Sequence, residues 1–332
     1  MTMMDLVLDI PEQLSWGAEV SPPDLPSGRP IVLVGMGGSA MGAGVGSLAA
    51  GAAPQPIVVH RSYGLPAWAV AASALVVGVS YSGNTEEVLS AVAAALDAGL
   101  PVAGVASGGG LAGLGEANGF PVVAVPPGLQ PRAALGYQAS AVVAVLRGAG
   151  AVSGGSSQLE EAAETVTAFL GGGEGAGFAL GVDLGEALVG RVTIAYGATG
   201  PGALAAYRWK TQINENAKMP AWWHEFPELN HNELQGWEAL PDLTTRSLGV
   251  VFLRDTGDPA PVQRRMDLTR EAIEGNVFVA GEVLAQGSGP LARFFTLAAT
   301  GDVASIVMAQ RAGIDPEPVA TIERFKVRLA EG

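Results

Sequence analysis

Short apolar runs that end in small residues constrain the fold of this chain more than any other feature. Residues 30–35 and 74–79 are two such runs, and each leads into a Gly- or Ser-rich turn and then into helix-forming sequence. A strand that is apolar at every position is buried on both faces, which is typical of a parallel sheet covered by helices. Further strands are expected at 57–60, 102–106 and 122–125. The alternation predicts a doubly wound, flavodoxin-like parallel sheet of the α/β class, with right-handed crossovers.

The same alternation restarts in the second half of the chain. Expected strands lie at 192–196, 247–253 and 277–280, and expected helices at 202–218, 259–274, 290–312 and 317–330. Gly-rich segments between residues 150 and 175 mark a boundary between the halves. We therefore predict two similar α/β domains, residues 1–152 and 153–332, with a helix closing the second.

Composition excludes several classes of function. At a net charge of −14, nucleic acid is not an expected partner, and local groups would have to hold an anionic ligand. The absence of Cys excludes disulfides and thiolate chemistry. The N-terminus lacks the features of a signal peptide, and the Ala-rich stretches are too short to span a bilayer. We expect a cytoplasmic protein without a membrane partner.

Polar and titratable side chains concentrate between residues 207 and 237. This stretch holds four Glu and two of the three His of a chain that is only 15% charged. Such a concentration is expected where chemistry occurs. Glu215 falls on the expected helix, whereas His231 follows two prolines that end helical structure. We predict that folding brings Glu215 and His231 together as a base and an acid. No metal is expected, because His231 has no Cys or paired His near it.

Two loops at expected strand ends are candidates for binding an anion. Ser80, Ser82 and Thr85 place three hydroxyls at a helix start, where backbone N–H groups and the helix dipole favour a phosphate. An ordinary capping box, with Asn84 as N-cap and Glu87 three residues later, also explains this loop, and spacing alone favours it because every helix needs a start. The Gly-rich turn at 37–39 lacks the Lys of a P-loop and the acidic partner of a dinucleotide fingerprint.

Three further charged or titratable residues lie outside these loops. Arg132 is a lone cation in an uncharged stretch, so it is either a surface charge or a group that stabilises an oxyanion. Lys326 lies on a charged terminal helix, which favours a solvated position. His224, next to Glu225, is expected at the surface.

Five motifs, taken in order, resemble the bifunctional phosphoglucose/phosphomannose isomerases, which are built from two sugar-isomerase (SIS) domains. The motifs are residues 35–40 (GMGGSA), 80–87 (SYSGNTEE), 131–132 (PR), 214–218 (NENAK) and 227–237 (PELNHNELQGW). They extend over essentially the whole chain, and the last two are the most specific. The sequence departs from the family pattern at 41–45, where an Asp is expected.

The resemblance implies a role for each matching residue. Ser39, Ser80, Ser82 and Thr85, with Gly37 and Gly38, would hold the phosphate of a sugar phosphate. Glu215 would move a proton between C1 and C2, and Arg132 would stabilise the cis-enediolate. His231 would assist ring opening from the neighbouring subunit of a homodimer, and Lys326 matches a C-terminal active-site Lys. Neither a metal nor another cofactor is implied.

The resulting hypothesis is an aldose–ketose isomerase that interconverts glucose 6-phosphate and mannose 6-phosphate with fructose 6-phosphate. One alternative is a SIS-type sensor that binds a sugar phosphate without turnover, which would need the phosphate loop but no base. Another is an isomerase or deaminase of a different phosphosugar. A dehydrogenase fits least, because the first Gly-rich loop lacks its acidic partner.

Overall fold

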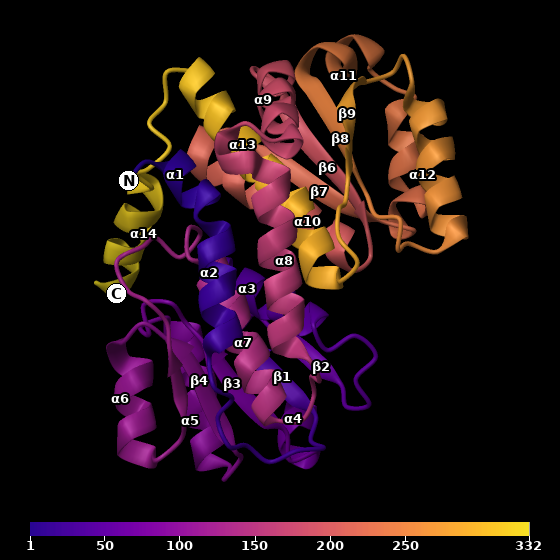
Figure 1. Ribbon diagram of the computed structural model, residues 1–332. Helices are drawn as coiled ribbons and strands as arrows, with labels where there is room; N and C mark the ends of the chain where they lie inside the picture. The colour runs from indigo at the N-terminus through magenta and orange to yellow at the C-terminus, as the bar shows by residue number, and fades with distance from the viewer. Residues whose placement is uncertain (332) are drawn as a thin grey trace. The chain divides into compact units, whose positions relative to one another are not determined.

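The computed structural model describes residues 1–331, and its contacts group the chain into two units (Figure 1). The N-terminal unit comprises residues 8–169 and 286–296, and the C-terminal unit comprises residues 1–7, 170–285 and the described residues from 297 onward. Each unit is built on one parallel sheet. By contacts, most of the helix at 155–170 groups with the N-terminal sheet, and the domain division at residue 152 stays a prediction.

The N-terminal sheet has five parallel strands in the order β2-β1-β3-β4-β5. This is the flavodoxin-like order, and the prediction of a doubly wound sheet is confirmed. Its strands are β1 (Ile31–Val34), β2 (Ile57–His60), β3 (Leu75–Val79), β4 (Val102–Ala106) and β5 (Val122–Ala124). Every residue of β1, β3 and β4 is buried, as expected for strands covered on both faces.

The helices of this unit are α2 (Ile10–Glu19), α3 (Gly37–Leu48), α4 (Ala67–Ala71), α5 (Glu86–Asp97), α6 (Gly109–Asn118), α7 (Leu135–Gly148) and α8 (Gly155–Leu170). Small residues let α3 and α7 approach closely. A Cβ on Gly46 would lie 2.7 Å from the Ala139 carbonyl oxygen, so a larger side chain would separate the two helices. Helix α7 therefore packs directly against the second half of α3.

The C-terminal sheet has four parallel strands in the order β7-β6-β8-β9, which repeats the first four positions of the other sheet. Its strands are β6 (Val192–Ala198), β7 (Ala221–Phe226), β8 (Leu248–Arg254) and β9 (Phe278–Leu284). The predicted second α/β domain is confirmed, but β7 is an edge strand that the sequence analysis did not predict.

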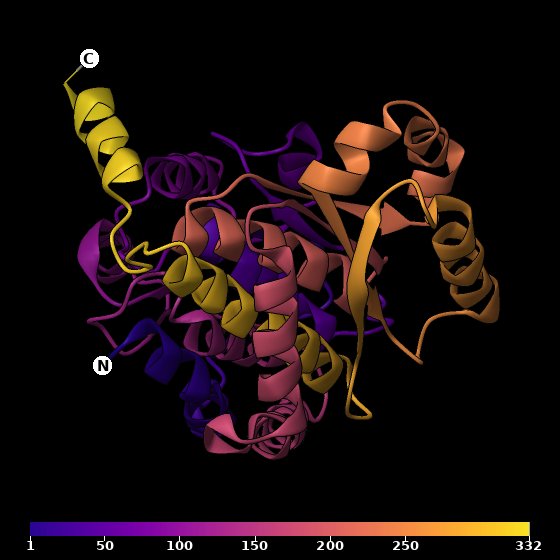
Figure 2. The same cartoon turned by 90° about the horizontal axis from the view of Figure 1, so that it is seen from above.

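The helices of this unit are α1 (Met3–Leu8), η1 (Gly171–Gly173), α9 (Ala176–Leu188), α10 (Pro201–Gln212), η2 (Ile213–Ala217), η3 (Glu228–His231), η4 (Glu233–Trp237), α11 (Pro241–Ser247), α12 (Ala260–Ile273), α13 (Pro290–Arg311) and α14 (Ala320–Ala330); α13 begins within the N-terminal unit. Tyr196, Phe226 and Phe252 share a core with Met266 of α12 on one face of the sheet. Helix α10 covers the other face, where Tyr207 contacts Trp223 of β7 (Figures 1 and 2).

Two helices near the C-terminus differ sharply in burial. Helix α13 is long and apolar enough to span a membrane by length and composition, but 94% of its most apolar window is buried inside the protein. This is how a core helix of a globular fold is placed. In α14, by contrast, every side chain from residue 320 to 329 is exposed.

Candidate active site

The hydroxyl loop after β3 is internally hydrogen-bonded. The Ser80 and Thr85 hydroxyls lie 2.8 Å apart, and the Thr85 N–H donates to the Ser80 hydroxyl at 3.3 Å. Ser82 is exposed and accepts from the Asn84 N–H at 3.2 Å. The capping-box interpretation is wrong, because Thr85 is the N-cap of α5 and the Asn84 side chain instead accepts from the Gly110 N–H at 2.9 Å. Within the described chain, no side-chain cap covers the first turn of α5.

A second small-residue turn, between β1 and α3, lies beside this loop. The Ser39 hydroxyl accepts from the Tyr81 N–H at 3.1 Å, which joins the two turns. Gly37 has a φ of +52°, a conformation that residues with a side chain rarely adopt. β1 and β3 are neighbours at the point where the strand order reverses, which is where doubly wound sheets bind ligands. The structure thus brings Ser39, Ser80 and Thr85 together at the carboxyl edge of the sheet.

Arg132 lies in the loop between β5 and α7, and the backbone of this loop contacts the turn at the start of α3. It is only 3% exposed, so the interpretation as a surface charge is wrong. A Cβ on Gly38 would lie 3.0 Å from the Pro131 carbonyl oxygen and 3.2 Å from the Arg132 nitrogen. Gly38 therefore has to lack a side chain for this loop to approach the α3 turn. The Arg132 guanidinium donates to the side-chain oxygen of Gln130.

Tyr81 holds the first part of the Arg132 loop, and it was not predicted as a site residue from the sequence. It is buried, and its hydroxyl donates to the Pro126 carbonyl at 2.8 Å and accepts from the Leu129 N–H at 3.0 Å. Burial raises the pKa of the Tyr81 phenol, so the group stays protonated and keeps both bonds. The position of Tyr81 between Ser80 and Ser82 was the only signal for it in the sequence.

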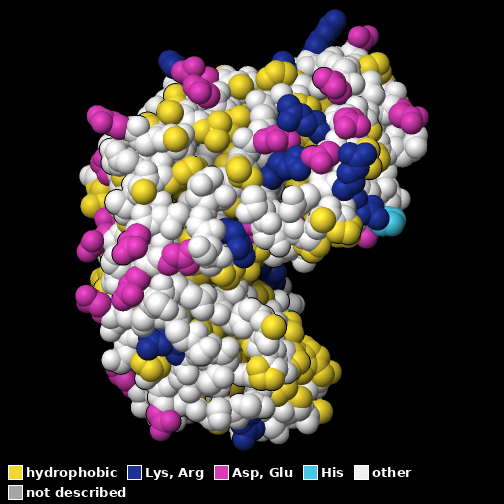
Figure 3. Space-filling view, turned by 45° about the vertical axis from the view of Figure 1, so that its right-hand side comes forward, with side chains coloured by type: hydrophobic (Ala, Val, Ile, Leu, Met, Phe, Trp, Pro, Cys, Tyr) yellow, Lys and Arg dark blue, Asp and Glu magenta, His cyan; other side chains and the backbone are white. Residues whose placement is uncertain are grey.

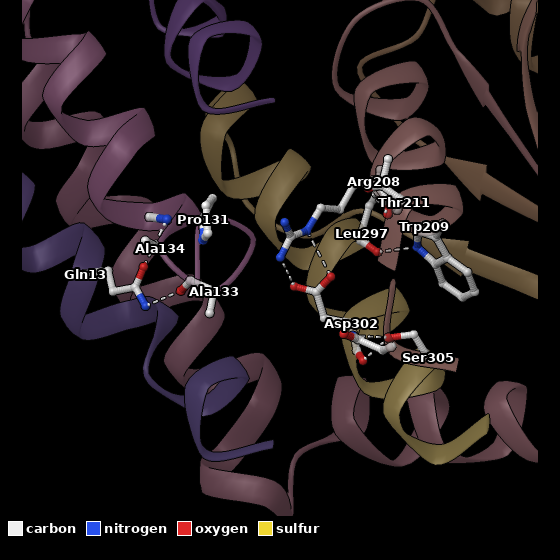
Figure 4. A network of polar contacts seen from close by, with 12 residues as sticks. Gln13, Pro131, Ala133, Ala134, Arg208, Trp209, Thr211, Leu297, Asp302 and Ser305 are labelled. Atoms are coloured by element: carbon white, nitrogen blue, oxygen red, sulfur yellow. Dashed lines mark hydrogen bonds and ion pairs between the residues drawn. The ribbon is translucent and has the colours of Figure 1, made fainter. Parts of the chain in front are cut away.

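Gln13 of α2 holds the other end of the same loop (Figure 4). Its side chain is fully buried, donates to the Ala133 carbonyl at 2.9 Å and accepts from the Gly136 N–H at 3.1 Å. It therefore caps the N-terminus of α7 from 123 residues away. A further amide, that of Gln138, donates to the Pro131 carbonyl at 2.8 Å. Three uncharged side chains thus fix the backbone on both sides of Arg132.

Glu215 lies on η2, a π-helical turn that continues α10, and it is half-buried. The predicted helix at 202–218 is thus α-helical only as far as residue 212. Single π-turns widen a helix locally and occur frequently at functional sites. Lys218 ends the turn with a φ of +56°. The turn changes which face of the helix each of its residues occupies.

The polar residues around Glu215 each have a tie within the C-terminal unit. Asn214 donates to the Met219 carbonyl at 2.8 Å, and fully buried Asn216 donates to the Ser305 hydroxyl of α13 at 2.9 Å. The Lys218 ammonium donates to the Glu215 backbone carbonyl at 2.6 Å. These bonds explain the spacing of the Asn-Glu-Asn-Ala-Lys motif, since its polar residues fix the backbone that carries Glu215.

A buried ion pair connects α10 to α13 one to two turns before Glu215 (Figure 4). The Arg208 guanidinium donates to both Asp302 oxygens, at 3.0 and 2.8 Å, and the two residues are 3% and 1% exposed. Burial raises the pKa of Asp302, and the Arg208 guanidinium opposes that rise. Neither residue was predicted, because 94 positions separate them.

His231 lies at the end of η3 and its side chain is exposed. Within residues 1–331 its imidazole makes no hydrogen bond or ion pair. The expectation for His224 is wrong: it is half-buried, and its Nδ1 lies 2.6 Å from a Glu233 oxygen. The other Glu233 oxygen accepts from the buried Tyr196 hydroxyl. Neither Tyr196 nor Glu233 was predicted as a site residue.

Glu215 and His231 lie at opposite ends of the strands of the C-terminal sheet, one at the amino edge and the other at the carboxyl edge. Helix α10 runs back from the carboxyl end of β6, so Glu215 lies near the amino edge, just before β7 begins. His231 follows the carboxyl end of β7, and that six-residue strand alone spans roughly 20 Å. The prediction that folding brings these two side chains together is therefore wrong within one chain.

The remaining predicted residue, Lys326, is exposed on α14. The protein carries a net charge of −14, and Figure 3 shows acidic side chains spread over the face it presents. An anionic ligand would therefore depend on local donors such as the hydroxyl loop and Arg132. Among the described residues, no group of three or more His, Asp or Glu is arranged to hold a metal ion.

Comparisons with known proteins define the class first. The bacterial phospho-glucose isomerase C-terminal SIS domain matches residues 181–329. The solved structure of tagatose-6-phosphate ketose/aldose isomerase from Escherichia coli superposes with a TM-score of 0.72 at 14% identity, covering 95% of this chain and 94% of that one. The fold is therefore that of double SIS-domain proteins.

Relatives of higher identity then define the family. The bifunctional phosphoglucose/phosphomannose isomerase of Caldicellulosiruptor bescii is 35% identical over 99% of both chains. The protein of the same name from Aquifex aeolicus is 34% identical over 92% of both chains. This chain belongs to the bifunctional phosphoglucose/phosphomannose isomerase family.

Proposed function

We propose that this protein interconverts glucose 6-phosphate and mannose 6-phosphate with fructose 6-phosphate. The observation that carries the proposal is Glu215, a half-buried carboxylate on a π-turn whose neighbours are each tied in place. A sensor that only binds a sugar phosphate has no use for a fixed base. The family assignment supports the same conclusion.

The chemistry requires one base and one cation near the first two carbons of the open-chain sugar. Glu215 removes the proton from C2 of the aldose and returns it to C1, through a cis-enediolate. Arg132 stabilises the negative oxygen of that intermediate, as a cation next to a developing charge does. Glucose 6-phosphate and mannose 6-phosphate give the same enediolate, so one site serves both.

The phosphate group of the substrate is assigned to the N-terminal unit. Ser39, Ser80, Ser82 and Thr85 offer hydroxyls beside the N-termini of α3 and α5, with Gly37 and Gly38 allowing close approach. Backbone N–H groups and helix dipoles at such a place attract a phosphate without any net positive charge. Lys326 of α14 is assigned to the active site on its match to the family motif alone.

His231 is proposed to open the sugar ring in the active site of a neighbouring subunit of a homodimer. The opposite-edge positions of Glu215 and His231 support this arrangement, because one chain keeps the two side chains a strand length apart. Each site of the dimer would then combine Glu215 of one subunit with the exposed His231 of the other. The enzyme is assigned to the cytoplasm and to carbohydrate metabolism.

The test is to measure fructose 6-phosphate formed from glucose 6-phosphate and, separately, from mannose 6-phosphate, with EDTA present and no nucleotide added. Turnover of both substrates supports the bifunctional isomerase. Turnover of glucose 6-phosphate alone narrows the specificity. If calorimetry shows binding of either sugar phosphate but no turnover follows, the sensor is favoured instead. Activity on a different phosphosugar would change the proposed substrate.

A further inference from the structure

We propose that Glu233, held by His224 and Tyr196, positions His231 for ring opening, so that His224 and Tyr196 act on catalysis without touching the substrate. The inference rests on the proposed function, because it concerns the step assigned to His231. The three residues form one hydrogen-bonded array across β6, β7 and η4.

The array is built on strand register. Tyr196 and His224 are paired neighbours on β6 and β7, so both side chains project from the same face of the sheet. Glu233 reaches them from the loop that covers this face. Because an ionised carboxylate only accepts hydrogen bonds, the Tyr196 hydroxyl and His224 Nδ1 both donate to it. Glu233 therefore ties the loop to two strands at once.

The tyrosine end of the array is rigid. Tyr196 is fully buried, and its ring contacts Phe226 and Phe252 edge-on at centroid distances of 6.1 and 5.7 Å. Burial, together with the Glu233 carboxylate, raises the pKa of the Tyr196 phenol, so the hydroxyl remains a donor. The histidine end is more accessible, since the His224 and Glu233 side chains are 30% and 31% exposed.

The His231 side chain has no hydrogen-bonded anchor of its own among the described residues, so its position depends on how the surrounding loop is held. Within the described residues its imidazole has no hydrogen-bonding partner, and the turn that joins the two single-turn helices around it is closed by a backbone bond from the Asn232 N–H to the Leu229 carbonyl at 3.4 Å. Before residue 231, the loop is held at buried Leu229 and at Asn230, which donates to Thr269 at 2.7 Å. After residue 231, the first tied position is Glu233, followed by buried Trp237, so releasing Glu233 loosens the side of His231 nearest to it.

Anomerisation gives a readout specific to this step. Opening and reclosing the ring exchanges the α and β anomers of glucose 6-phosphate. This exchange requires no proton transfer between C1 and C2. Exchange NMR measures the rate on the enzyme, and a Glu215→Gln background removes isomerisation from the measurement. In that background, we expect His231→Ala to slow enzyme-dependent anomerisation by about 10²-fold, with a residual rate that can still be measured.

His224→Ala and Tyr196→Phe should each lower the anomerisation rate by about 10-fold or more, towards the ~100-fold that a displacement of about 1 Å costs a reacting group. Calorimetric affinity for glucose 6-phosphate should remain unchanged. Asn232→Ala is the matched control, because among the described residues its exposed side chain bonds only to Glu228, at 3.3 Å, and it should behave as the parent.

The decisive comparison is the double variant His224→Ala/His231→Ala. If His224 acts through His231, the double variant is no slower than His231→Ala alone. The inference would be overturned if His224→Ala lowered the anomerisation rate by the same factor with and without His231. It would also be overturned if His224→Ala and Tyr196→Phe both anomerised glucose 6-phosphate at the parental rate. His224 lies on an edge strand and its side chain is 30% exposed, so His224→Ala remains informative if Tyr196→Phe is poorly folded. A wild-type protein that makes no fructose 6-phosphate would refute the proposed function instead.

Discussion

The two sheets share a strand order but differ in where they present their polar groups. In the N-terminal unit, Ser39, Ser80, Thr85 and the Arg132 loop all meet at the carboxyl edge, at the β1/β3 switch point. In the C-terminal unit, Glu215 lies near the amino edge and His231 at the carboxyl edge. The same topology therefore supplies one concentrated site in the first unit and two separated groups in the second.

The two units also hold their groups in different ways. The N-terminal loops are short turns whose hydroxyls bond to each other within five residues. The groups of the C-terminal unit depend on distant partners, such as Ser305 for Asn216 and Tyr196 for Glu233. We conclude that a binding loop can be encoded locally, whereas the placement of a single base requires the whole unit to be folded.

The largest effect should come from the base itself. We expect Glu215→Gln to lower kcat by roughly 10²- to 10⁴-fold, the usual contribution of general acid–base catalysis. Binding of glucose 6-phosphate should persist, because the phosphate loop belongs to the other unit. Fructose 6-phosphate formation measures the first quantity and calorimetry the second. Glu238→Gln, at an exposed position, is the control, and a Glu215→Gln enzyme with full turnover would remove Glu215 from the mechanism.

The next largest effect should come from breaking the buried Arg208–Asp302 ion pair, which supports the helix leading to Glu215. Asp302→Ala leaves the Arg208 guanidinium buried without its partner, which destabilises a protein by about 3–5 kcal/mol. Urea unfolding should show this loss. Replacing both residues, as Arg208→Met with Asp302→Leu, should recover much of the stability. Equal stability of the single and double variants would contradict the assignment of the cost to an unpaired buried charge.

The difference between local and distant contacts also explains what the sequence could predict. Strands β1, β3 and β4 were predicted because every residue is apolar, and buried parallel strands carry that pattern. Strand β7 was missed because it lies between Pro220 and Pro227 and includes His224 and Glu225, which are tolerated at the sheet edge.

Site residues follow the same division. The hydroxyls at 80–85 form a recognisable cluster in the sequence, and the structure places them at one turn. Gln13 and Asp302 could not be found in this way, because their partners are about a hundred residues away and no spacing rule links them. The separation of Glu215 from His231 was also hidden, since it depends on the direction of α10 across the sheet.

Distant contacts also support the N-terminal site, and the contact from Gln13 tests how general the difference between the two units is. Gln13→Met would leave the Ala133 carbonyl and the Gly136 N–H buried without their partner, which costs about 1–3 kcal/mol. Gln55→Met is the matched control, because Gln55 is also buried and its amide nitrogen makes no hydrogen bond within the described residues. Chemical unfolding of both variants should show a loss only for Gln13→Met. A simultaneous fall in kcat would show that the Arg132 loop moves when its anchor is lost.

The smallest effects are expected in the hydroxyl loop, where alanine substitutions of two serines should differ in their consequences. Ser82 is exposed and, within residues 1–331, its hydroxyl bonds only to the Asn84 N–H, so Ser82→Ala should change stability by less than about 0.5 kcal/mol and KM by only a few-fold. Ser80 is fully buried and bonds to Thr85 twice, so Ser80→Ala should raise KM about 10-fold or more, as expected when a hydrogen bond to a charged group is lost. Steady-state kinetics with glucose 6-phosphate measures both. If Ser82→Ala proves the more damaging, the phosphate lies at the exposed rim of the loop, and the buried Ser80–Thr85 pair serves only to shape it.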